Sequence, residues 1–126
     1  MINLDYLCIE AVQDIGNNGD KSILQKALGI LQEDGIYAMF LWLEDKNYKN
    51  IRTSITKLLN KEEIKKYLLD STNESFNDNF KEFCVNLQKI AENIDKLFFL
   101  KKILERTLTY ALYHTKIEGS KNVEKD

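Results

Sequence analysis

The chain contains no proline, and this absence constrains its fold more than any other feature of the sequence. Proline breaks helices and marks turns, so its absence favours long helices joined by short polar connections. Apolar residues recur at steps of three and four along most of the chain, the spacing that places them on one face of a helix. The sequence therefore predicts an all-α fold, a single-domain helical bundle of about five to seven helices.

The apolar periodicity also predicts where these helices lie. Expected helices cover residues 3–15, from 22 onward, 47–59, 61–69, 78–90 and 94–117. The Gly- and Asn-rich segment 16–20 is expected to end the first helix, because both residue types tolerate the left-handed conformation of helix ends. Ser22 with Gln25 and Asn60 with Glu63 have the spacing of capping boxes, so Ser22 and Asn60 are the expected helix N-caps.

Residues 36–43 form an eight-residue run that is apolar on all sides. Gly35 precedes it, either as a break or as a close-packing point inside a continuing helix. A buried strand fits this run by pattern alone, but no second strand candidate exists to pair with it. We therefore expect a central, fully buried helix in which Phe40 and Trp42 anchor the core.

Length and termini indicate one domain. With 126 residues there is room for one core, and residues 1–117 are assigned to it. Residues 118–126 are charged and poor in apolar residues, so we expect a disordered tail. No stretch resembles a signal peptide or approaches the roughly 20 apolar residues of a membrane span. The expectation is a cytoplasmic protein without membrane contact, with Cys8 and Cys84 as buried, unpaired thiols.

The residue types that carry catalysis or bind metals are scarce. His114 is the single histidine, and no His or Cys ligands fall in closely spaced groups. The five glycines form no phosphate-binding loop. We therefore expect no enzymatic activity, no metal, no cofactor and no small-molecule substrate. A helical enzyme with an unrecognised carboxylate pair stays open as a third hypothesis.

Charge is segregated along the chain. Residues 1–45 hold two Lys and eight acids, a balance of −6, whereas residues 46–61 hold five cations and no acid, a balance of +5. Residues 62–95 hold four Lys and eight acids, a balance of −4, and residues 96–116 hold five cations and one acid, a balance of +4. Both arginines of the chain, Arg52 and Arg106, lie in the basic blocks, and Arg can grip two phosphate oxygens at once.

In the last expected helix, cations, a hydroxyl and a ring share one face. At 100° per residue Lys102, Arg106, Thr109, Tyr113 and Lys116 lie within about 80° of arc, opposite a leucine-rich face. This mixture suits a sugar-phosphate backbone, with a ring available for stacking. The candidate RNA-binding residues are Arg52, Lys57, Lys102, Arg106, Tyr113 and Lys116. Two alternatives remain open: a solvated charged face, and head-to-tail self-association of basic and acidic faces.

Two stretches resemble a known family. Leu24 to Leu43 is an apolar helix, a polar pair, a Gly and an apolar run ending in an aromatic and Leu; Leu104 to Ile117 holds an Ala-Leu pair, an aromatic and a basic residue. Together they resemble the small helical subunit of type III-B CRISPR (Cmr) effector complexes, the fifth Cmr protein family. Tyr113 and Lys116 match the family's aromatic and basic positions. Arg52 and Lys57 match no motif of the family, and they are candidates only because they lie in a basic block.

The resemblance implies a non-catalytic subunit of an RNA-guided antiviral complex. Several copies would stack along the effector filament, bound to other CRISPR effector subunits and to the crRNA–target RNA duplex. The small subunit of type III-A (Csm) complexes has similar size and helicity and stays open as an alternative. A rival from another class is a protein–protein adaptor or toxin–antitoxin-like regulator that uses its acidic faces and binds no nucleic acid.

Overall fold

The periodic apolar stripes fold as α-helices. The computed structural model describes residues 4–18, 20–70 and 74–125, with side chains described within 6–16, 20–70 and 74–117. Over these residues the regular elements are seven helices and no strand, which confirms the all-α bundle expected from the sequence. The helices are α1 Leu4–Asn18, α2 Lys21–Asp34, α3 Ile36–Asp45, α4 Lys49–Leu59, α5 Glu62–Leu69, α6 Phe80–Ala91 and α7 Ile94–Lys125.

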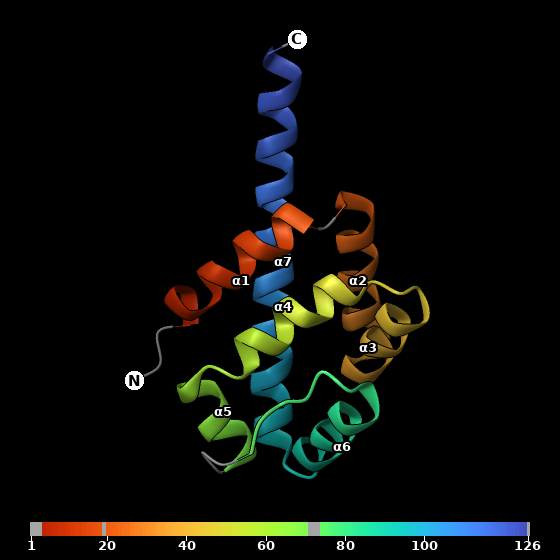
Figure 1. Cartoon of the computed structure of the whole chain (residues 1–126), viewed down its shortest axis with the longest axis vertical. Helices are drawn as coiled ribbons and strands as arrows, with labels where there is room; N and C mark the ends of the chain where they lie inside the picture. The colour runs from red at the N-terminus through yellow and green to blue at the C-terminus, as the bar shows by residue number, and fades with distance from the viewer. Residues whose placement is uncertain (1–3, 19, 71–73, 126) are drawn as a thin grey trace.

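Helix α7 is the element around which the others are arranged. It runs the length of the molecule behind α4, with α1 and α2 against its middle and α5 and α6 near its beginning (Figure 1). One side of α7 is fully buried, through Leu100, Ile103, Leu104, Leu108 and Ala111. Burying an aliphatic side chain of this size contributes about 1.5–3 kcal/mol, so this stripe accounts for much of the packing that holds the bundle together.

The last turns of α7 project beyond α1 and α2 (Figure 1). Helix α7 reaches Lys125, whereas the sequence analysis placed its end at Ile117. No proline interrupts residues 118–125, and adding a residue to an existing helix is far easier than starting one. The separation of a domain 1–117 from a tail 118–126 stays a prediction.

The segment from Gly35 to Leu43 differs in part from expectation. Gly35 interrupts the helix between α2 and α3 with a φ of 102°, a conformation that residues with a Cβ rarely adopt. Ile36, Met39, Phe40 and Leu43 are buried, as expected. The prediction of a helix buried on all sides is wrong, because Tyr37 and Leu41 are exposed.

The two expected core anchors of α3 behave differently. Phe40 is fully buried and makes an edge-on contact with Phe83 of α6, with ring centroids 4.8 Å apart. Trp42 is only partly buried and packs beside Tyr48, with centroids 5.4 Å apart. Helix α3 thus packs one face against the core and exposes its opposite face to solvent.

Two N-cap predictions are corrected by the contacts of single side chains, whereas α1 ends at Asn18, inside the segment 16–20 that was expected to end it. Asp20, rather than Ser22, caps α2, because its carboxylate accepts a hydrogen bond from the Ser22 backbone N–H at 2.7 Å. Asn60 does not cap α5; its amide instead binds the backbone N–H and C=O of Phe76, at 2.7 and 3.0 Å. Gly16 lies inside α1, where a Cβ would come within 2.4 Å of His114 of α7. Gly16 therefore permits the close approach of α1 to α7 rather than ending the helix.

Candidate nucleic-acid interface

The outward face of α7 gathers four of the six candidate residues. Lys102, Tyr113 and Lys116 are exposed and Arg106 is half-buried, all on the side of α7 opposite its buried stripe. Two acids lie near them: Asp95 is exposed, and Glu105 forms an ion pair with Lys101 at 3.8 Å. Because Lys101 offsets Glu105, this face keeps a net positive charge over residues 95–116. The sequence prediction of a basic, aromatic-bearing face on this helix agrees with the exposed fractions.

Tyr113 and Lys116 form the best-defined contact on this face. Tyr113 is 57% exposed, and the Lys116 ammonium nitrogen lies 5.6 Å from the centre of its ring. A cation at this distance is attracted by the electrons of the ring face. The contact fixes a positive charge beside an accessible aromatic surface. That pairing suits a nucleotide, whose base and phosphate need different partners.

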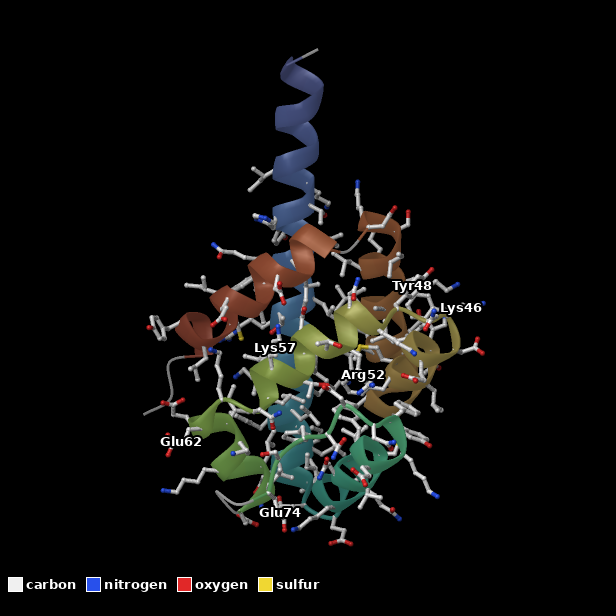
Figure 2. The ribbon with its side chains drawn as sticks, viewed as in Figure 1. Lys46, Tyr48, Arg52, Lys57, Glu62 and Glu74 are labelled. Atoms are coloured by element: carbon white, nitrogen blue, oxygen red, sulfur yellow. The ribbon has the colours of Figure 1, made fainter. Side chains whose placement is uncertain are left out.

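Lys57 lies apart from the α7 face, on α4 beside α1 (Figure 2). It lines a groove of about 310 Å³ whose other members include Glu10, Asp14 and Lys61. The Lys61 ammonium pairs with Glu10 at 3.1 Å, and Ser54 donates a hydrogen bond to Asp14 at 2.7 Å. Two acids of α1 therefore lie in the same groove as Lys57, which belongs to α4 and not to the α7 face.

Arg52 does not lie on a basic surface. Only 6% of the residue is exposed, and its side chain points toward α3 and α6 (Figure 2). Its guanidinium donates hydrogen bonds to the carbonyl oxygens of Asn77 and Asp78, in the segment that leads into α6. Its Nε lies 3.3 Å from a carboxylate oxygen of Glu44, an ion pair without an aligned hydrogen bond.

Aromatic rings complete the surroundings of Arg52. The guanidinium carbon is 5.7 Å from the ring centre of Phe80 and 5.5 Å from that of Phe83. The positive charge is thus satisfied inside the molecule by a carboxylate, two carbonyls and two rings. Arg52 joins α4 to α3 and α6, so its guanidinium is occupied away from the α7 face.

A second groove lies beside the α7 face, and sequence reasoning missed it. It has a volume of about 310 Å³ and is lined by α1 and α7 residues Ile9, Val12, Gln13, Tyr110, Tyr113, His114 and Ile117. Ile9, Tyr110 and Ile117 are each at least 41% exposed. The signal was present in the sequence, because Ile9 falls outside the apolar stripe of its own helix. Large apolar side chains away from a helix's core stripe indicate a second contact surface where they gather in one patch.

The remaining candidate chemistry is sparse. His114 is half-buried against Gly16. Cys8 is fully buried, as expected, whereas Cys84 is only partly buried, and desolvation by the surrounding side chains raises the pKa of its thiol. Among the residues whose side chains are described, no group of three or more His, Cys, Asp or Glu is placed to hold a metal ion.

No protein family, characterised protein or solved structure matches this chain in sequence or fold comparison. None of the helices in the described part of the chain combines the length and the apolar character needed to cross a bilayer.

Proposed function

We propose that this chain is a non-catalytic small subunit of a type III CRISPR RNA-guided effector complex, acting in antiviral defence in the cytoplasm. It stacks with further copies of itself and with other effector subunits, and it contacts target RNA through the outer face of α7. The support is the resemblance of residues 24–43 and 104–117 to the Cmr small subunit, together with the all-α fold. The type III-A subunit is the alternative within the same class.

The observation that carries the proposal is the exposed combination of Lys102, Tyr113 and Lys116, with Arg106 between them on the same face. Each phosphate neutralised by a lysine releases bound counterions, so binding through this face depends strongly on salt. An isolated chain carries a net charge of −2 and repels a polyanion at its acidic surfaces, so it should bind RNA weakly. Stacked copies align their basic faces and bind more strongly.

Exposed apolar side chains supply the contacts between subunits. Val85 of α6 and Ile94 and Phe98 at the start of α7 are each at least 61% exposed. Large apolar and aromatic side chains are often buried at the centre of protein-contact surfaces. They suit packing against a neighbouring subunit, and they equally suit the partner of an adaptor protein, which is the second candidate function.

The experiment is a salt titration of target-RNA binding by complexes rebuilt with wild-type or variant subunit. The test variant carries Lys102→Glu and Lys116→Glu. The control carries Lys66→Glu and Lys81→Glu, the same charge change at exposed positions of α5 and α6. We expect the test variant to assemble normally, to bind RNA more weakly and to show a shallower dependence on salt by about one to two phosphate contacts. Equal affinity and slope for both variants would refute RNA contact through α7 and favour the adaptor.

A further inference from the structure

The groove between α1 and α7 has walls of two kinds. Tyr110 and Tyr113 contribute aromatic rings from α7, whereas Ile9 and Val12 contribute aliphatic side chains from α1. Both tyrosines are accessible, with 41% and 57% of their surface exposed. Such a groove can hold a flat, apolar-faced group between a ring and an aliphatic wall.

Polar groups line the same groove. Gln13 and His114 are among its lining residues, and their side chains carry hydrogen-bond donors and acceptors. A planar heterocycle has an apolar face and a polar edge, so it needs both kinds of wall. At about 310 Å³ the groove lies at the small end of the range for ligand sites, which fits one ring system rather than a large ligand.

Charge identifies the rest of the occupant. The Lys116 ammonium stands 5.6 Å from the ring centre of Tyr113, at the edge of the groove, and Arg106 lies one turn before Tyr110 on α7. A group that rests on the tyrosines therefore has a cation within reach of an attached phosphate. An apolar side chain of another protein would gain nothing from this charge.

We propose that the α1–α7 groove is a binding site for an unpaired nucleobase of an RNA strand, with Lys116 neutralising the adjoining phosphate. This inference rests on the proposed function, which supplies the RNA, and it adds that the bound strand is unpaired where it crosses α1. The base stacks on Tyr110 or Tyr113, and Gln13 and His114 bind its edge. Stacking is tolerant of sequence because every base has a flat face, so the site reads the presence of a base rather than its identity.

The test compares a short oligouridylate with an abasic oligomer of the same length and charge, both bound to the full chain at low ionic strength. Wild type should bind the oligouridylate about fivefold or more tightly than the abasic oligomer, the effect of one stacked base. Replacing both groove tyrosines, Tyr110→Leu with Tyr113→Leu, should bring this ratio to about one. The control Tyr37→Leu, at a tyrosine of α3 that is 55% exposed, should keep it.

The outcomes separate this inference from the proposed function. The variant with Lys102→Glu and Lys116→Glu should bind both oligomers more weakly, and its binding should depend less on salt. If it does so while wild type shows no preference for the base-bearing oligomer, the RNA contact stands and the nucleobase site is refuted. If the isolated wild-type chain binds neither oligomer, the comparison is repeated with the rebuilt complex, where equal binding of the two oligomers refutes the site.

A second measurement does not depend on variants. Photo-crosslinking of 4-thiouridine oligomers to the wild-type chain should label peptides of α1 and α7 that contain the groove residues. Labelling confined to other helices would overturn the assignment. Sedimentation without RNA provides a further test. If the wild-type chain self-associates and the paired tyrosine replacement abolishes that self-association, the groove is covered by a second copy and the assignment is overturned.

Discussion

Replacing Arg52 should weaken the junction of α3, α4 and α6 without unfolding the bundle. The wild-type guanidinium is held by Glu44, by the carbonyls of Asn77 and Asp78 and by two phenylalanine rings. Arg52→Ala removes every one of these contacts and leaves the two carbonyls without their donor. The carboxylate of Glu44, with 31% of its side chain exposed, also loses its partner.

The magnitude follows from these contacts. Removing one member of a buried ion pair costs about 3–5 kcal/mol, and hydrogen bonds to a charged group contribute about 1.5–3 kcal/mol each. The two terms overlap, and water can reach Glu44, so we expect a loss of roughly 3–4 kcal/mol. A domain of this size has a total stability of about 5–15 kcal/mol, so the fold should survive this loss. With an unfolding entropy of about 2.1 cal/mol/K per residue, Tm should fall by roughly 11–15 °C.

Urea unfolding followed by circular dichroism measures the loss, and two further variants locate its origin. Arg52→Lys keeps the charge but not the planar fork, so it should recover only part of the stability. Glu44→Gln removes only the ion pair and should cost about 1 kcal/mol. A loss of stability below about 1 kcal/mol for Arg52→Ala would refute this role of Arg52. It would mean that water can replace the contacts of the guanidinium, which would leave Arg52 available for a role at the surface.

Three other predictions concern packing and reactivity. Gly16→Ala should destabilise the fold by about 1–3 kcal/mol, since its Cβ would meet His114 at 2.4 Å, and His114→Ala should relieve most of that loss in a double-mutant cycle; additive losses would contradict the contact. Trp42→Ala should cost about 2 kcal/mol by thermal unfolding, less than a fully buried Trp, because part of its surface is already in water. Alkylation should modify Cys84 before Cys8 in the native protein, because Cys8 is fully buried. The rate of alkylation at Cys84 should still rise above the pH at which the rate of an ordinary thiol levels off, because burial raises the pKa of Cys84. Equal rates at both cysteines would contradict their difference in burial.

The fold class was readable from the sequence because it depends on apolar spacing, which is a property of each helix by itself. The helix ends were harder to predict, because Gly and Asn occur at helix ends and also in other roles, as Gly16 and Asn60 do here. Gly16 lies inside α1 because α7 passes close to it, and Asn60 is occupied by the backbone of Phe76. Neither partner is near in sequence, so local rules could not identify it.

The same reasoning explains the mixed result for the candidate site. Lys102, Tyr113 and Lys116 are exposed as expected, because the solvent face of an amphipathic helix follows from its own core stripe. Arg52 sits on a helix whose polar face is covered by the segment leading into α6, and periodicity carries no information about that cover. The α1–α7 groove was missed for a related reason, since it exists only where two distant helices meet.

The pairing of α1 with α7 has a consequence for how the chain is made. Thr107 donates to the sulfur of Cys8 at 3.4 Å across a separation of 99 residues, and the contacts of α1 are mostly with α7 and α4. During synthesis α1 therefore leaves the ribosome long before α7 exists, and until then its apolar stripe can be covered only where it packs on α4. Helices α4 to α6 can assemble locally in the meantime. The docking of α1 onto α7 is therefore a long-range step that has to follow the synthesis of α7.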